Sequence, residues 1–135
     1  MSTNCLFCKI VKKQIPCHKI IETESCLGFL DINPLNRGHA LVIPKEHAQF
    51  MHQVSDATLS EMLPAVKKIA LALGASDYNI LQNNGRLAHQ EVDHVHFHII
   101  PKDSNGGLSI GWNVSPEAMP FAQLAKELSE KVSKF

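Results

Sequence analysis

The spacing of apolar residues predicts one long amphipathic helix in the middle of the chain. Between residues 55 and 74, one helical face is formed by Leu59, Met62, Leu63, Val66, Ile69, Ala70 and Leu73. Ser55 suits the N-cap of this helix and Gly74 suits the position after its C-terminus. Pro64 lies inside the segment and predicts either a kink or a later start of the helix.

The end of the chain carries a second helical pattern. A single apolar face is formed there by Phe121, Leu124, Ala125, Leu128, Val132 and Phe135. Pro120 favours a start of the regular helix near Phe121. A shorter helix is predicted between residues 5 and 15, because Pro16 would end it.

Short apolar or alternating runs separated by turn-forming residues predict several strands. They cover residues 18–22, 26–31, 39–44, 78–82 and 92–100. Strands and helices do not alternate regularly, which indicates an α+β fold with a mainly antiparallel sheet and two principal helices. We expect one domain over residues 1–112, with residues 113–135 forming a helical extension that packs on the same domain.

Composition narrows the class of protein. The 135 residues include 13 Lys or Arg and 13 Asp or Glu, so the formal net charge is zero and a nucleic-acid partner is not expected. The sequence has no apolar run long enough to cross a bilayer and no signal-peptide pattern, so we expect no membrane partner and a location in the cytoplasm, extending to the nucleus. In that setting the four cysteines are expected to be thiols or metal ligands rather than disulfides.

Histidine is the unusual residue type, because three of the eight alternate along one predicted strand. In such a strand His94, His96 and His98 share one face, with neighbours about 6.6 Å apart. Adjacent positive charges disfavour protonation of all three rings, so at least one ring should be neutral near pH 7. A neutral imidazole can be a ligand in a zinc hydrolase or a nucleophile that attacks phosphorus. The pattern alone leaves both chemistries open.

The run His94-Val95-His96-Phe97-His98-Ile99-Ile100 resembles the signature of the histidine triad (HIT) superfamily. Similar segments occur in the same order at residues 5–10, 29–34, 38–47, 83–85 and 90–93. The chain is most similar to the Hint branch, which cleaves nucleoside phosphoramidates. The alternatives are a dinucleoside polyphosphate hydrolase, as in the Fhit branch, and a non-catalytic nucleotide-binding or interaction module. The resemblance also implies a homodimer with a sheet that continues across the interface.

The resemblance implies a purine nucleotide substrate and a role for each site residue. His96 would attack the α-phosphorus, and water would then release a nucleoside monophosphate from the nucleotidyl-histidine. His98 would bind a phosphate oxygen or the leaving group, while His94 and His39 would support the site and hold the His96 tautomer. The implied nucleotide-binding residues are Phe7, Ile10, Phe29, Asp31, Ile32, Asn83, Gln90, Glu91, Val92 and His98. No cofactor is required for this catalysis.

Some of these positions have simpler interpretations or depart from the family pattern. Asp31 precedes Ile32-Asn33-Pro34 and is also typical of a turn, whereas the resemblance makes it the acceptor of ribose hydroxyls. His89 stands where family members often have Gly. Animal Hint proteins end soon after a Trp-Pro-Pro segment, whereas this chain continues past Trp112 to Phe135.

A Cys-x-x-Cys pair near the N-terminus suggests a metal site. By resemblance to relatives that bind zinc, its ligands would be Cys5, Cys8, His47 and His94. Four protein ligands would close the coordination sphere, so the zinc would be structural. The simpler interpretation is two thiols on a short helix.

Overall fold

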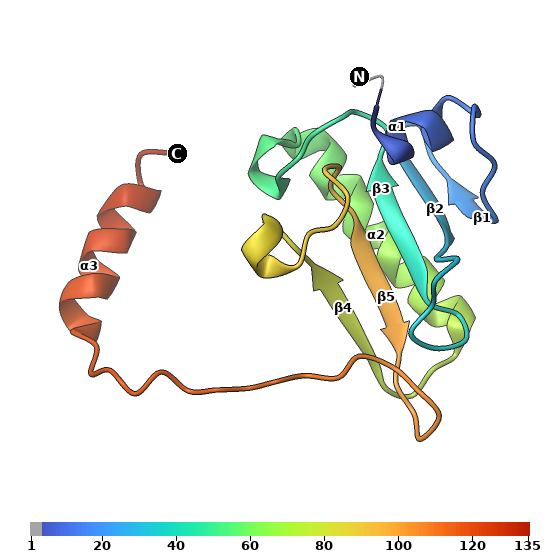
Figure 1. Cartoon of the computed structure of the whole chain (residues 1–135). Helices are drawn as coiled ribbons and strands as arrows, with labels where there is room; N and C mark the ends of the chain where they lie inside the picture. The colour runs from blue at the N-terminus through green and yellow to red at the C-terminus, as the bar shows by residue number, and fades with distance from the viewer. Residues whose placement is uncertain (1–3) are drawn as a thin grey trace.

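A computed structural model describes residues 4–135 and contains one five-stranded antiparallel sheet (Figure 1). The strand order is β1-β2-β3-β5-β4, with β1 (Lys19–Glu22), β2 (Cys26–Leu30), β3 (Ala40–Pro44), β4 (Tyr78–Gln82) and β5 (Phe97–Pro101). The helices are α1 (Leu6–Val11), α2 (Asp56–Leu73) and α3 (Phe121–Val132). The predicted α+β class with a mainly antiparallel sheet is confirmed. Within the described residues, no helix combines the length and hydropathy that a bilayer span requires.

The long central helix begins and ends as predicted. The Ser55 side chain accepts a hydrogen bond from the Thr58 amide, and Gly74 follows the last turn with a left-handed φ of 65°. Pro64 neither ends α2 nor delays its start. Pro64 has no N–H, so one backbone carbonyl of the preceding turn lacks its helical partner. Pro64 is on the exposed side of the helix, where water can reach that carbonyl.

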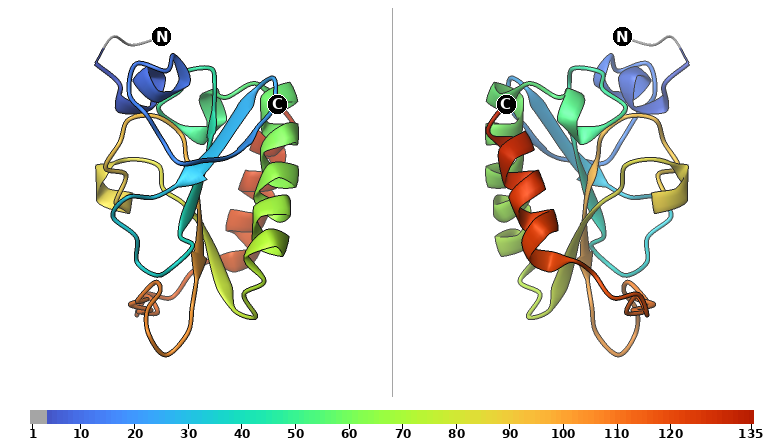
Figure 2. Two further views of the ribbon diagram at one scale, coloured as in Figure 1. Left: turned by 90° about the vertical axis from the view of Figure 1, so that its right-hand side faces the viewer. Right: turned by 90° about the vertical axis from the view of Figure 1, so that its left-hand side faces the viewer.

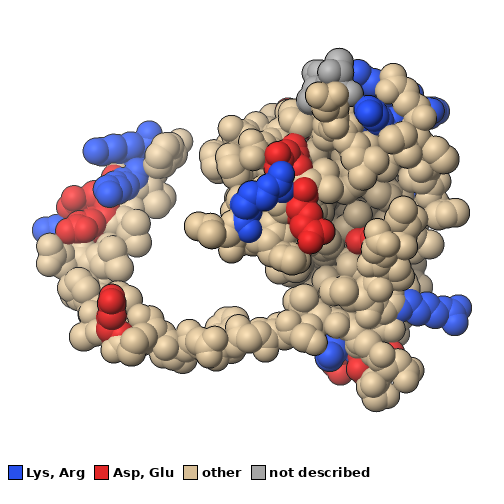
Figure 3. All heavy atoms as spheres, in the orientation of Figure 1, with Lys and Arg blue, Asp and Glu red and all other residues tan. Residues whose placement is uncertain are grey.

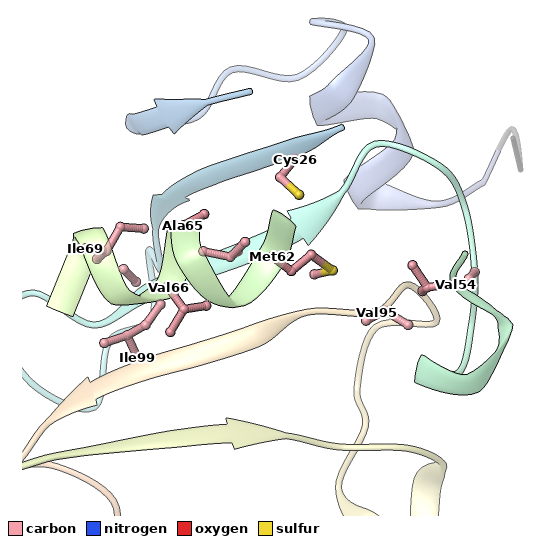
Figure 4. Close-up of a cluster of buried hydrophobic side chains, with 11 residues drawn as sticks. Cys26, Val54, Met62, Ala65, Val66, Ile69, Val95 and Ile99 are labelled. Atoms are coloured by element: carbon pink, nitrogen blue, oxygen red, sulfur yellow. The ribbon is translucent and has the colours of Figure 1, made fainter. Parts of the chain in front are cut away.

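The sheet is covered on both faces, which explains the continuous apolar run of β3. Val42 faces α2 and packs with Met62 and Ile69 in one cluster (Figure 4). Leu41 faces the other way and packs with residues of α1 and β2 in a second cluster. Gly28 allows α2 to approach β2 closely, because a Cβ there would lie 2.9 Å from Cδ1 of Ile69.

The predicted strand over residues 92–100 is too long, because β5 begins only at Phe97. Before that residue the chain turns: the His94 amide donates to the Val92 carbonyl at 2.9 Å, and the Val95 amide donates to the Ala48 carbonyl at 2.8 Å. Pairing with β3 also ends at Val42 and Phe97. His94 and His96 therefore lie in the segment that enters the sheet, and only His98 lies within the strand.

The C-terminal extension is helical but does not pack on its own domain, contrary to expectation. Helix α3 begins at Phe121 as predicted, and none of its residues is buried. A segment without regular secondary structure leads it past the β4 edge and away from the sheet (Figures 1 and 2). The apolar stripe of α3 thus finds no surface on its own chain.

Candidate active site

A cavity of about 430 Å³ opens on the face of the sheet opposite α2. This volume lies within the usual range of small-molecule sites, about 300–1,000 Å³. Predicted residues that line it are Phe7, Ile10, Phe29, Asp31, Ile32, His39, Asn83, Glu91, Val92, His96 and His98. The wall also contains residues that sequence reasoning missed, among them Leu6, Ile15, Pro16, Cys17, Leu81 and Leu108. They come from separated segments that share no pattern, so no local signal could have identified them.

The apolar end of the cavity is joined directly to the histidines by one ring. Phe7 packs edge-on against Phe29, with ring centroids 5.8 Å apart, and against His96, with centroids 5.1 Å apart. Both phenylalanines are buried and also belong to the core cluster on this side of the sheet. They are therefore core residues and cavity wall at once, and a flat apolar group bound there would lie next to His96.

The protonation state of His96 follows from its hydrogen bond. Its Nδ1 lies 2.7 Å from the His94 carbonyl oxygen, which can only accept, so Nδ1 carries the proton and Nε2 bears a lone pair. Burial lowers the pKa of His96 below its ordinary value and favours the neutral ring. His96 is thus a neutral imidazole with Nε2 available for attack.

A chain of hydrogen bonds fixes the opposite tautomer in His98. The Leu35 amide donates to Nδ1 of His39 at 3.0 Å, so a neutral His39 carries its proton on Nε2. That Nε2 lies 2.9 Å from Nδ1 of His98 and 3.5 Å from Oδ2 of Asp31. His98 therefore accepts at Nδ1 and carries its own proton on Nε2.

Burial also keeps these two rings neutral. It lowers the pKa of His98 to about 4 and holds that of His39 below its ordinary value, although the Asp31 carboxylate partly opposes the shift in His39. The structure thus places His39 against His98, whereas sequence reasoning expected it to hold His96. The Leu35 amide, which sets the tautomer of His39, gave no signal in the sequence because a backbone donor is not encoded by residue type.

Asp31 combines the two roles considered for it. Its Oδ1 accepts a hydrogen bond from the Asn33 amide at 2.8 Å, which is the turn-forming contact. The same carboxylate lines the cavity and is only partly exposed. A carboxylate has several acceptor sites, so the turn does not use up its capacity for ligand hydroxyls.

The buried side chain of Gln90 stabilises the loop between β4 and β5. This side chain is 1% exposed, accepts from the Gly85 amide at 2.8 Å, and donates to the carbonyls of Gln49 and Val92 at 2.7 and 3.1 Å. Gln90 therefore lies behind the cavity wall, although sequence reasoning grouped it with the nucleotide-binding residues. His89 adopts a left-handed φ of 67°, a conformation that glycine adopts easily, so the loop keeps this shape with a histidine in place of Gly.

Cys5, Cys8, His47 and His94 come together in a second cluster, in which Cys8 and His94 are buried and His47 is partly exposed. Their ligand atoms all lie within 4.8 Å of one another. Nδ1 of His94 lies 3.4 Å from Sγ of Cys5, 3.5 Å from Sγ of Cys8 and 3.3 Å from Nδ1 of His47. Ligand atoms of a tetrahedral zinc site with the usual bond lengths are about 3.3–3.6 Å apart where a nitrogen is involved. These atoms fit a zinc ion.

The second ring nitrogen of His94 supports that fit. Its Nε2 lies 2.8 Å from the Pro44 carbonyl oxygen, so Nε2 carries the proton and the Nδ1 lone pair faces the two thiols. Histidine ligands commonly donate their other N–H to a backbone carbonyl in this way. Asp31, His39 and His98 form one further group with the spacing of metal ligands, and His96 belongs to neither group within residues 4–135.

Comparison with known proteins places this geometry in a family context. The HIT domain family matches residues 12–105. Adenosine 5'-monophosphoramidase from Schizosaccharomyces pombe is 56% identical over 133 residues, which cover 96% of this chain and 98% of that protein. The Saccharomyces cerevisiae protein of the same name is 48% identical over 96% of this chain and 82% of its own length.

Solved structures agree with these sequence matches. A hypothetical protein from Leishmania major superposes with a TM-score of 0.91 at 50% identity, over 100% of both chains. A histidine triad nucleotide-binding protein from Candida albicans gives a TM-score of 0.86 at 46% identity, over 97% of this chain and 99% of that one. A HIT family protein from Bacillus anthracis gives 0.89 at 36% identity, over 100% of this chain and 99% of that one.

Proposed function

The chain belongs to the HIT family, and from this premise we propose that it is a hydrolase that cleaves the P–N bond of adenosine 5'-phosphoramidates and releases AMP. One observation carries the assignment: a neutral His96 with a lone pair on Nε2 lies beside a neutral His98 with a proton on Nε2. Their ring centroids are 4.9 Å apart. A nucleophile and a proton donor therefore face the same cavity.

In the first step, Nε2 of His96 attacks the α-phosphorus. The P–N bond breaks as the new bond forms, and the leaving amine takes the proton from Nε2 of His98. His98 is then an anion, and its charge is offset by the positive charge of the phosphorylated His96 ring beside it. The His94 carbonyl receives the hydrogen bond of the Nδ1–H and stabilises the positive charge that develops on His96. The product is an adenylyl-histidine at His96 and a free amine.

In the second step, water attacks the phosphorus of that intermediate. His98 now has a lone pair on Nε2 and accepts the proton of the water, which restores the starting state of both rings. AMP leaves and His96 is neutral again. The backbone N–H groups of Glu91 and Val92 have no acceptor within residues 4–135, and we assign them to the phosphate oxygens in both steps.

The cavity supplies separate places for the base and the ribose. The purine lies against Phe7, Ile10 and Phe29, while the exposed Ile32 covers its outer edge. Asp31 accepts from the ribose hydroxyls with the oxygen sites that the Asn33 amide leaves available. Asn83 lies between the ribose and the phosphate, with its amide already donating to the His89 carbonyl.

The test compares two substrates. Purified protein is expected to turn over adenosine 5'-phosphoramidate faster than diadenosine polyphosphate, and His96→Asn is expected to remove both activities while AMP still binds. Mass spectrometry of wild-type protein quenched during turnover should find AMP on His96. Faster turnover of the dinucleotide would instead assign the chain to the polyphosphate hydrolases. Normal turnover by His96→Asn would refute the mechanism.

We also propose that Cys5, Cys8, His47 and His94 hold a structural zinc ion. The support is the spacing of their ligand atoms and the orientation of His94 by the Pro44 carbonyl. Zinc would tie α1 to the segment that enters β5, and it would take no part in the reaction because four protein ligands leave no open position.

A homodimer is proposed for the same protein. Strand β4 is at the edge of the sheet, and Tyr78 and Ile80 are 46% and 42% exposed along it. Pairing of β4 with β4 of a second copy would continue the sheet across a two-fold axis and satisfy the open edge.

A further inference from the structure

Helix α3 presents an apolar stripe that nothing in its own chain covers. Phe121, Leu124, Leu128 and Val132 are 74%, 40%, 51% and 68% exposed. Lys126, Glu127 and Glu130 lie on the other side of the helix, and Lys131 flanks the stripe, so the stripe is an apolar face of the kind that is usually buried. A soluble protein rarely exposes such a continuous apolar surface without a partner for it.

The helix also needs a support that its own chain does not give. A 12-residue helix is marginal in water without tertiary contacts. The arm before it, residues 109–120, is exposed and has no regular secondary structure. Fully extended, such an arm reaches about 40 Å, which is enough to carry the helix onto a neighbouring molecule.

The position of the arm recurs in relatives. Residues 109–135 make up 27 of 135 residues, so a TM-score could not exceed about 0.8 if this tail failed to superpose. The Leishmania and Bacillus anthracis structures both exceed that value over the whole chain. An unsupported arm would lose conformational entropy in taking one position, so a contact outside the single chain must hold it.

The same chain offers a matching landing surface. Leu63 and Leu71 are 57% and 72% exposed on the outer side of α2. Tyr78 and Ile80 face the same side of the sheet as α2, because Ile80 pairs with Ile99 and Ile99 packs in the α2 cluster. Figure 2 shows that α3 lies in the same layer as α2, on that side of the sheet.

We propose that α3 of one copy docks on the α2 and β4 surface of a second copy, and that the second copy returns its own α3 in exchange. The second copy would fill the open space between α3 and the body of the molecule in Figure 3. A two-fold axis makes both contacts identical, so one stripe and one landing surface per chain are enough. The proposal rests on the homodimer proposed above and does not depend on the phosphoramidase activity.

The direct test is photo-cross-linking in the full-length chain. A p-benzoylphenylalanine at position 124 is irradiated in a mixture of isotope-labelled and unlabelled copies, and the cross-linked peptides are mapped by mass spectrometry. We expect links between labelled and unlabelled chains, with the acceptor peptides in α2 or β4. Links confined to one chain, or to another surface of the partner, would overturn the exchange.

The second test measures the contribution of the stripe to assembly. Leu128→Glu should raise the dimer dissociation constant at least tenfold in sedimentation. Ala122→Glu adds the same charge off the stripe, with Lys126 four residues later, and should leave the dissociation constant unchanged. Equal dissociation constants for both variants and wild type would overturn the docking of α3. A wild-type chain that is monomeric throughout would refute the homodimer as well, and AMP release assayed on the same samples reports the enzymatic proposal separately.

Discussion

Replacing His39 tests the proton path through the site, because this side chain hydrogen-bonds to the proposed proton donor His98. His39→Leu removes the 2.9 Å hydrogen bond from Nε2 of His39 to Nδ1 of His98. The His98 ring then loses the contact that keeps its proton on Nε2. A typical intramolecular hydrogen bond contributes about 0.5–1.5 kcal/mol, so turnover of adenosine 5'-phosphoramidate should fall by roughly twofold to tenfold. His98→Ala removes the proton donor itself and should reduce turnover by about 10²–10⁴.

The choice of leaving group distinguishes a role of His39 in proton transfer from a general disruption of the active site. The leaving nitrogen of the phosphoramidate must gain a proton to depart as ammonia, whereas the 4-nitrophenolate of a 4-nitrophenyl ester of AMP can leave as an anion. His39→Leu should therefore slow the phosphoramidate and leave hydrolysis of the ester nearly unchanged. His39→Gln places an amide N–H near the position of Nε2 and should recover much of the loss. If His39→Leu lowers both rates equally, His39 only maintains the shape of the cavity and the proton path is wrong.

Three further outcomes are expected. Asp31→Ala should weaken AMP binding by about 1.5–3 kcal/mol in calorimetry and leave 2',3'-dideoxy-AMP unaffected, because only the ribose hydroxyls use the carboxylate; equal losses for the two ligands would make Asp31 a turn residue alone. Because burial lowers the pKa of His98 from 6.5 to about 4, the unfolded chain binds a proton there that the folded chain does not, and the free energy of unfolding should fall as the pH drops from 6.5 towards 4. His98→Asn should flatten that slope in denaturant titrations, and an unchanged slope would contradict the assignment. EDTA should lower the Tm of the wild-type protein, whereas Cys8→Ser should have a lower Tm from the start that EDTA does not change. Cys17→Ser, outside the cluster, is the control. A wild-type Tm that chelation does not change would refute the zinc proposal.

The sequence was sufficient to predict those elements whose conformation depends on interactions within one short segment. Apolar spacing, an N-cap serine and a following glycine defined α2 from Ser55 to Gly74, because helix hydrogen bonds and caps act within a few residues. The continuous apolar run of β3 reflects burial on both faces of the sheet. The alternating histidines and the ordered motifs around them identified the family, and most of the predicted nucleotide-binding residues do line one cavity.

Tertiary structure alone decided what depends on distant partners. The alternation of residues 92–100 predicts a strand, yet it cannot show that pairing with β3 stops at Phe97 and that the chain turns at His94. His39 and His98 are 59 residues apart and meet because β3 pairs with β5, which no local pattern specifies. The apolar stripe of α3 was visible in the sequence, but where it lies was not. A hydrophobic helix face indicates only that some surface will cover it. The arm leads α3 away from its own domain, so that domain does not cover the stripe.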